Sequence, residues 1–301
     1  MGLLVVGSVA LDSTRTPFGK VRDALGGTAV NFATAASYFT NVGLVAVVGS
    51  DFPRKHVEFL KRRGVDVSGL YFAEGKTFRY SSSFGYDLND RTTIDTQLNV
   101  FEGFQPEIPE HLKRSEFVFL APILPELQLS VLDQVESLKF SACDTMDFYI
   151  EGYRADLLKT IASVDAMIMN DSECRQLADE PNLVKASRVV LSMGPGIVIV
   201  KKGEHGALLF TSESCFSAPA YPCEAVFDPT GAGDAFAGGF MGHLARTGDL
   251  SDANIRRAVI YGTVMASFCV EQFSVAGMAS LTQNDIDARY RDLKEISHFE
   301  L

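Results

Sequence analysis

The chain of 301 residues is 47% hydrophobic and carries 27 basic against 38 acidic side chains, which gives a formal net charge of −11. This length and apolar content suffice for one large α/β domain with a smaller appendage, or for two domains. An acidic surface repels nucleic acid and anionic membranes, so we expect neither as a partner, and an anionic substrate must be attracted locally.

The cysteines and the N-terminal segment bear on the compartment. The 5 cysteines are dispersed, form no C-x-x-C pair and do not have the spacing of zinc ligands. Such a set is typical of reduced thiols in a cytoplasmic protein. The first residues lack a basic region, and no apolar segment approaches the ~20 residues that span a membrane. We therefore expect a cytoplasmic protein.

The N-terminal part predicts a strand, a glycine pair and a helix. The β-branched run Leu3–Val9 favours a buried strand of a parallel sheet, and Asp12 follows its end. Because ligands bind at the carboxyl ends of strands in such sheets, Asp12 is a candidate for binding substrate hydroxyls, with turn capping as the alternative. Gly26 and Gly27 permit close backbone approach before a helix. Asn31, one turn into that helix, offers a donor and an acceptor, although an asparagine here more often bonds the local backbone.

A second strand is predicted over residues 44–49, followed by a helix over 53–63. From Val67 to Phe104 the aromatic residues recur with partial period-two alternation, which indicates a few antiparallel strands and hairpins. Together with residues from about 12–24, this segment is predicted to form a small β-sheet lid over the end of the main sheet. Its aromatic side chains are candidates for stacking on a base or sugar, but most are expected to cover one face of the sheet.

The α/β pattern then resumes, with predicted strands and helices at 116–121, 125–138, 140–144, 155–163 and 166–169. Asn170 and Glu173 follow the last of these strands with the spacing of a capping box, which is the simpler interpretation. The alternative is that both lie at the carboxyl end of the strand and help to hold Mg²⁺ through water.

A strand, a turn and a strand are predicted over residues 197–210. Either Lys201 or Lys202, at the turn, is a candidate to reach an ATP phosphate as a point charge. Further helices are expected at 253–269 and 285–295.

The most informative stretch is Asp228–Asp234, which opens a helix predicted over residues 232–244. Gly231 and Gly233 let the backbone turn tightly and bring its N–H groups to an anion such as phosphate, which a helix N-terminus favours. A carboxylate there would repel phosphate unless it takes a proton from an attacking hydroxyl, so Asp234 is a candidate general base. The alternative is an ordinary glycine-rich helix start. Neither a dinucleotide fingerprint nor a Walker A loop fits the chain.

The glycine pair with Asn31, the Asn170–Glu173 pair and the Asp228–Asp234 stretch resemble, in this order, the motifs of the ribokinase (PfkB) family of sugar and nucleoside kinases. The resemblance implies a doubly wound, mostly parallel sheet flanked by helices (α/β/α) with a β-sheet lid, in a single domain over residues 1–301. It also implies transfer of the γ-phosphoryl group of ATP to a hydroxymethyl group, with ATP and Mg²⁺ as cofactors and K⁺ as a further candidate.

The resemblance assigns roles position by position. Asp234 is similar to the catalytic base, and the anion hole corresponds to the amides of Gly231, Ala232 and Gly233. The contacts to a polyhydroxylated, ribose-like substrate correspond to Asp12, Gly26, Gly27 and Asn31. The nucleotide contacts correspond to Asn170, Lys201, Lys202, Gly203, Gly206, Thr230, Gly231 and Gly233.

Two metal positions are implied in the same way. Glu173 matches the position tied to Mg²⁺ through water, and Asp228 a position tied to a monovalent cation. Ser274 stands where the family often has glycine near the monovalent-cation loop, so potassium activation does not follow from the resemblance.

The substrate and the oligomeric state stay open. A nucleoside such as adenosine or inosine is the leading prediction, because the lid is rich in aromatic residues and Ala10 stands where sugar kinases often carry asparagine. A sugar or cyclitol such as ribose, fructose or inositol is the alternative. A non-catalytic nucleotide-binding protein would keep the fold but lose the base, and Asp234 argues against it. Both a monomer and a lid-mediated homodimer are compatible with the sequence.

Overall fold

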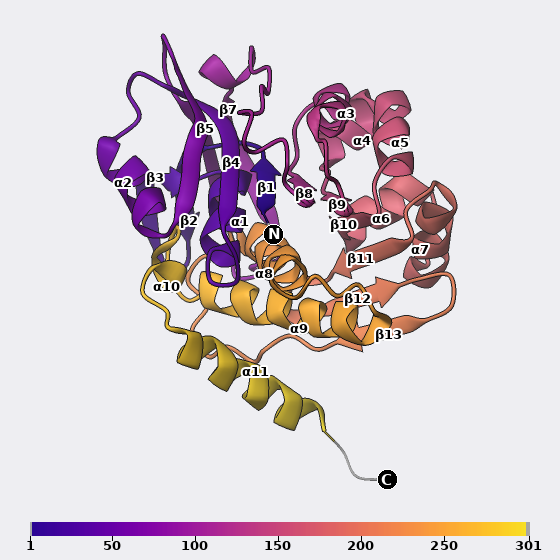
Figure 1. Ribbon diagram of the computed structural model, residues 1–301. Coiled ribbons are helices and arrows are strands. Elements are labelled where there is room, and N and C mark those ends of the chain that lie inside the picture. Colours follow the sequence, from indigo (N-terminus) through magenta and orange to yellow (C-terminus); the bar gives the residue numbers. More distant parts are fainter. Residues whose placement is uncertain (1, 299–301) are drawn as a thin grey trace.

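A nine-stranded sheet forms the centre of the part of the chain that the computed structural model describes, residues 2–298 (Figure 1). Its strands are β1 Leu3–Val6, β4 Val42–Gly49, β5 Val65–Ala73, β8 Phe117–Leu120, β9 Phe140–Cys143, β10 Ala166–Asn170, β11 Ile197–Lys201, β12 Ala207–Phe210 and β13 Cys215–Ala218. They lie in the order β13-β12-β11-β10-β9-β8-β1-β4-β5, parallel from β5 to β11 and antiparallel at β12 and β13.

The chain winds outward from β1 in both directions, first to β4 and β5 and then to β8 and beyond. The strand order therefore reverses beside β1, and ligands of open α/β sheets bind outside the carboxyl ends of the strands at such a point. This confirms the predicted doubly wound, mostly parallel sheet.

Alternate residues of the strands enter two separate apolar cores. In β1, Leu3 and Val5 face one core, and Leu4 and Val6 face the other. The first core is covered by α1 Thr28–Ala36, α2 Arg54–Arg62, α8 Ala232–Thr247 and α9 Asp252–Cys269. The second is covered by α3 Pro125–Gln134, α5 Arg154–Ala162, α6 Asp171–Ala178 and α7 Leu183–Ser192. Period-two alternation with both faces apolar is what a sheet between two helical layers requires.

Three further helices complete the described chain. They are the short helix α4 Asp147–Gly152, and α10 Ala276–Ala279 and α11 Gln283–Ser297, which pack on α9. Among the described helices, none combines the length and the apolar character needed to cross a membrane. The cytoplasmic location stays a prediction.

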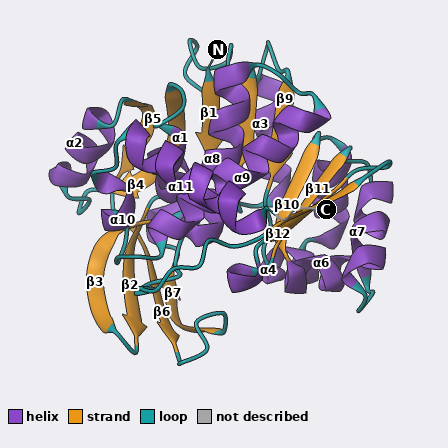
Figure 2. Ribbon diagram, turned by 90° about the horizontal axis from the view of Figure 1, so that it is seen from below, coloured by secondary structure: helices purple, strands orange, loops and turns teal. Residues whose placement is uncertain are grey.

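A second, smaller sheet stands out from one end of the main sheet (Figure 2). It contains β2 Ala10–Thr16, β3 Gly19–Gly26, β6 Phe78–Phe84 and β7 Arg91–Gln97, in the order β3-β2-β6-β7. The central pair, β2 and β6, is parallel, and the outer pairs are antiparallel. The antiparallel hairpin predicted within residues 67–104 is present as β6 and β7. The parallel pairing of β2 with β6 was not predicted, because it joins hairpins that lie far apart in the chain.

The predicted bounds of this sheet need a correction. Residues 65–73 form β5, which pairs in parallel with β4 at the edge of the main sheet, so the first part of the segment 67–104 lies outside the small sheet. At the other end of that segment, Phe104 is buried in the second core of the main sheet. The aromatic alternation of the segment does not reveal which sheet a strand joins, since both choices bury similar side chains.

Three α-helices and one strand were not predicted: α4, α7, α10 and β13. The start of α7 carries a local signal, because the side chain of Asn182 accepts a hydrogen bond from the amide of Lys185 as an N-cap. Its buried residues, Ala186, Ser187 and Val190, are small or β-branched and give a weak helical pattern.

Glycines allow α8 to pack closely against α1 and α9. A Cβ on Gly238 would lie 2.4 Å from the carbonyl oxygen of Phe32 in α1, and one on Gly239 would lie 2.6 Å from that of Tyr261 in α9. Backbone atoms cannot yield to such a contact as the end of a flexible side chain can. The glycines therefore fix the position of α8, and with it the position of the stretch at its start.

We expect Gly238→Ala to lower the free energy of unfolding by about 1–3 kcal/mol, because the new methyl group must displace the backbone of α1. Denaturant titration of the full chain measures this. Gly152→Ala, in α4, is the matched control: a Cβ there meets nothing within 4 Å, so a small gain or no change is expected. Equal stability of the two variants would contradict the packing argument.

Candidate active site

The start of α8 presents backbone N–H groups at the carboxyl end of the main sheet. Gly231 is the N-cap, in the left-handed conformation with φ 80°, and the first bond of the helix runs from the Ala235 amide to the Gly231 carbonyl at 2.8 Å. The amides before Ala235 have no acceptor within the helix. That of Ala232 donates to the Pro229 carbonyl at 3.2 Å, so of the three predicted anion-hole amides only those of Gly231 and Gly233 remain candidates in this structure.

Asp234 lies in the first turn of α8 and is half-buried. Burial raises the pKa of its carboxyl to about 7, with smaller upward contributions from the charges of Asp144 and Asp12, while the charge of Lys201 acts in the opposite direction. A general base is most effective when its pKa lies near the working pH. Asp234 thus has both the partial access and the pKa that proton transfer requires.

Lys201 lies beside the start of α8 and forms an ion pair with Asp144. Its Nζ donates to Oδ2 of Asp144 at 2.6 Å, and Asp144 is only 3% exposed. A Cβ on Gly233 would lie 3.0 Å from the same Nζ, so the glycine leaves room for the lysine to reach the turn. Burial raises the pKa of Asp144, and the charge of Lys201 opposes this shift. Lys201 therefore places a cation next to the turn that is predicted to bind an anion.

Asp144 is a site residue that the sequence analysis missed. It follows β9 directly, at the edge of the sheet where ligands bind. An acidic residue immediately after a buried strand was the available signal, but its lysine partner lies 57 residues further along the chain.

Asn170 and Glu173 form the predicted capping box at the start of α6. The Glu173 amide donates to Oδ1 of Asn170 at 2.7 Å, and the Asn170 amide donates to Oε2 of Glu173 at 2.8 Å. This confirms the capping interpretation. Burial, followed by the charge of Asp144, raises the pKa of Glu173 to about 8. Its carboxyl group therefore lies in the same acidic cluster as the Lys201–Asp144 pair.

The predicted substrate residues meet at the start of α1. Oδ2 of Asp12 accepts the Gly27 amide at 3.2 Å, and a Cβ on Gly26 would collide with that carboxylate at 2.0 Å. The Asn31 side-chain amide donates to the Gly27 carbonyl at 3.3 Å. Oδ1 of Asp12 and Oδ1 of Asn31 are buried, and neither has a hydrogen-bond partner among residues 2–298. Both oxygens are therefore free to bind a ligand.

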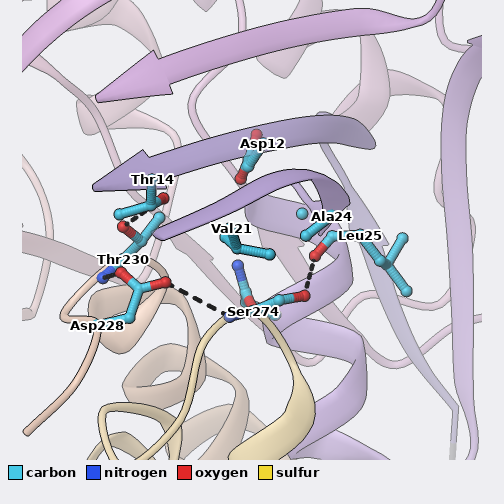
Figure 3. A pocket seen from close by; sticks show the side chains of 10 residues that line it. Asp12, Thr14, Val21, Ala24, Leu25, Asp228, Thr230 and Ser274 are labelled. Atoms are coloured by element: carbon cyan, nitrogen blue, oxygen red, sulfur yellow. Dashed lines mark hydrogen bonds between the residues drawn. The ribbon is translucent and has the colours of Figure 1, made fainter. Parts of the chain in front are cut away.

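A small pocket joins these residues to the loops around α8 (Figure 3). Its lining includes Asp12, Thr14, Asn31, Asp228, Thr230 and Ser274. Oδ1 of Asp228 accepts the Thr230 amide at 3.0 Å, and Oδ2 accepts the Ser274 amide at 3.4 Å. The hydroxyl of Ser274 in turn donates to the Leu25 carbonyl. Asp228, which is 2% exposed, thus fastens the loop before α8 to the loop before α10.

The strand β2 is also bound to the loop before α8. The hydroxyl of Thr16 donates to the Phe227 carbonyl at 2.8 Å, and the hydroxyls of Thr14 and Thr230 lie 3.4 Å apart. Asp12 lies on the same strand. These two contacts therefore connect the strand that carries Asp12 directly with the loop that leads into α8.

The loop after β11 contains the remaining predicted nucleotide residues. The Lys202 amide donates to the Gly206 carbonyl at 2.8 Å around a 3₁₀ turn, Gly203–His205. Gly203 and Gly206 have φ values of 55° and 80°, which favour glycine. Of the two lysines that were predicted to reach a phosphate, Lys201 lies beside the start of α8.

An anion-binding helix start, a neighbouring lysine and a carboxylate of near-neutral pKa, placed at the carboxyl end of a doubly wound sheet, define a phosphotransferase that acts on small molecules. Residues 3–281 match the model of the pfkB family carbohydrate kinases. The chain belongs to this family.

Relatives of known activity agree with this family. The chain is 32% identical over 255 residues to a cytidine kinase of Thermococcus kodakarensis, covering 82% of this chain and 89% of the relative. It is 27% identical over 291 residues to a nucleoside kinase of Methanothermobacter thermautotrophicus, covering 89% of each chain. It is also 27% identical to a ribokinase of Lactococcus lactis, covering 96% of this chain and 97% of the relative.

Solved structures confirm the fold. The nucleoside kinase of Methanocaldococcus jannaschii superposes with a TM-score of 0.77 at 22% identity, covering 97% of this chain and 98% of the other. A nucleoside kinase of Burkholderia thailandensis, solved in complex with inosine, gives a TM-score of 0.78 at 20% identity, covering 96% and 97%.

Proposed function

We propose that the protein is an ATP-dependent nucleoside kinase, which transfers the γ-phosphoryl group of ATP to the hydroxymethyl group of a nucleoside. The observation that carries the proposal is the position of Asp234, a half-buried carboxyl of pKa about 7 beside the Lys201 ammonium group. The cytidine kinase and nucleoside kinase relatives support a nucleoside as the acceptor.

Phosphoryl transfer needs positioning and charge stabilisation more than covalent chemistry from the protein. Asp234 accepts the proton of the attacking hydroxyl. The amides of Gly231 and Gly233 and the ammonium group of Lys201 stabilise the charge that develops on the transferred group, a contribution of several kcal/mol in comparable sites. ATP, when bound, supplies the phosphoryl group.

The nucleoside that accepts the phosphoryl group is bound through the two unpaired oxygens of the pocket. Oδ1 of Asp12 and Oδ1 of Asn31 are buried acceptors, and ribose hydroxyls are donors of matching chemistry. Leaving such atoms unpaired is costly, so a ligand that satisfies them gains affinity.

Divalent-metal binding fits the carboxylates around Lys201. Mg²⁺ keeps several of its waters and is bound by one or two carboxylates together with substrate phosphates. Glu173 and Asp144 are the candidates, while residues 2–298 contain no group of three or more His, Cys, Asp or Glu side chains that could form an all-protein metal site. A monovalent cation at Asp228 stays a prediction, and both oxygens of that carboxylate already accept backbone amides.

The small sheet is proposed to act as a lid that excludes water from the transfer. All seven residues of its edge strand β7 are exposed. A monomer and a homodimer formed through this edge both remain compatible with the fold.

A panel of acceptors tests the proposal. The full chain is incubated with ATP and Mg²⁺ and with cytidine, uridine, adenosine, inosine, ribose, fructose or inositol, and ADP release is measured for each. We expect kcat/KM to be highest for a nucleoside. Turnover of a free sugar or cyclitol with no increase for any nucleoside would favour the alternative, which the ribokinase relative supports. ATP binding without turnover of any acceptor would indicate a non-catalytic nucleotide-binding protein and would contradict both.

A further inference from the structure

An arginine of the small sheet has an aromatic neighbour but no acidic partner. Arg91 is the first residue of β7 and is exposed. In the part of the chain that the structure describes, it forms no ion pair, whereas Arg79 on the neighbouring strand β6 binds both Asp23 and Asp51. The guanidinium group of Arg91 is therefore available to an anionic ligand.

The register of the sheet places Arg91 on the same face as Asp12. Asp12 on β2 and Tyr80 on β6 are directly paired, so their side chains lie on one face of the sheet. The guanidinium group of Arg91 lies over the Tyr80 ring, 5.5 Å from its centroid. That face carries the acceptor residues, as the orientation of Asp12 toward the pocket shows (Figure 3).

The hairpin that carries Arg91 reaches across to the loop after β11. The side-chain amide of Asn89, two residues before Arg91, donates to Oε1 of Glu204 at 3.2 Å. A Cβ on Gly203 would lie 2.1 Å from Oδ1 of Asn89, so the turn and the loop are in direct contact. This contact holds the start of β7 near the end of β11, where Lys201 lies.

The charges are coupled as this geometry requires. The positive charge of Arg91 lowers the pKa of Asp234, although burial has the larger, upward effect. The charge of Arg91 thus acts on the same carboxyl group as the charge of Lys201.

We propose that Arg91 is a catalytic residue, whose guanidinium group binds the phosphoryl group during its transfer from ATP to the acceptor. The inference rests on the proposed kinase function. In the transfer, the acceptor oxygen bonds to the γ-phosphorus as the bond from phosphorus to the ADP oxygen breaks, the hydroxyl proton goes to Asp234, and the electron pair leaves with ADP. Negative charge spreads over the transferred oxygens, and a bidentate guanidinium group matches their geometry.

The first test compares Arg91→Gln with Arg91→Lys and with a matched control, Arg22→Gln, on β3 of the same sheet. Arg22 has a side chain that is 91% exposed. We expect Arg91→Gln to lower kcat by ~10²-fold or more. Arginine fingers provide ~10³-fold or more, so this is a modest effect for such a group. Arg91→Lys should restore part of the rate, added guanidinium ion should restore part of the rate of Arg91→Gln, and Arg22→Gln should match the wild type.

The pH profile distinguishes this role from a structural one. Removing the positive charge raises the pKa of Asp234, so the acid limb of kcat/KM should move to higher pH in Arg91→Gln and stay in place in Arg22→Gln. An unchanged kcat in Arg91→Gln, or a loss confined to KM, would overturn the proposal.

A binding measurement separates this proposal from the kinase proposal. Fluoroaluminate imitates the phosphoryl group in transfer when ADP and a nucleoside are also bound. We expect the wild type to bind fluoroaluminate in this complex at least ~10-fold more tightly than Arg91→Gln does, and both proteins to bind ADP alone with equal affinity. Equal affinity for the mimic would refute the role of Arg91 even if the enzyme turns over. A wild type that turns over no acceptor would refute the proposed function instead.

Discussion

Asp234→Asn is expected to lower kcat by at least ~10²-fold, the lower end for loss of a general base. The amide side chain is similar in size and keeps the start of α8 intact, but it cannot accept the hydroxyl proton. ATP binding should survive, since the amides of Gly231 and Gly233 and the Lys201 ammonium group are unchanged. Steady-state rates and calorimetric titration with ATP measure the two effects. Near-normal turnover would remove Asp234 from the mechanism.

The pH dependence provides a second measurement on the same residue. Because the pKa of Asp234 is about 7, the wild-type kcat/KM should fall as the pH drops below about 7 and the carboxyl becomes protonated. The raised pKa also means that the ionised carboxyl opposes folding, so the stability that protonation gives is lost as the pH rises from the usual 3.8 toward 7. Asp234→Asn should therefore melt at a higher temperature than the wild type at pH 8, and without this advantage below the usual pKa.

Lys201→Met is expected to reduce both stability and activity. It leaves the buried carboxylate of Asp144 without its partner, and breaking such a pair typically costs about 3 kcal/mol or more. It also removes the cation beside the start of α8, so kcat should fall as well. Thermal unfolding and steady-state kinetics at the same pH measure the two losses.

The double variant Asp144→Asn/Lys201→Met is the control that separates them. It removes both charges, so most of the lost stability should return, while kcat should stay low because the cation is still missing. If the double variant recovers activity together with stability, Lys201 serves only the fold. Unchanged stability in Lys201→Met would contradict the buried ion pair.

Local signals in the sequence identify the two helix starts of the site. The spacing of Asn170 and Glu173 predicts a capping box, which is present. The glycines around Ala232 predict a tight turn into a helix, and Gly231 does have the positive φ that this turn requires. Both features depend on residues within a few positions of one another, so they can be predicted from the local sequence.

Features that depend on distant pairings could not be predicted in the same way. The ion pair of Asp144 and Lys201 exists because β9 and β11 end at the same edge of the sheet on either side of β10. The assignment of β5 to the main sheet follows from its pairing with β4, and an alternating strand pattern does not choose its neighbour. The position of Arg91 on the same face as Asp12 likewise follows only from the pairing of Tyr80 on β6 with Asp12 on β2.

The hydrogen bonds from β2 to the loop before α8 limit how the substrate preference of this enzyme can change. The strand carries Asp12, the carboxylate proposed to bind the substrate, and Thr14 and Thr16 bind the same strand to the loop that precedes the candidate base. A substitution on β2 made to admit a new acceptor would therefore also disturb the proton acceptor. Directed evolution toward new substrates should succeed more readily at the exposed positions of β3, which carry none of the residues assigned to the phosphoryl transfer.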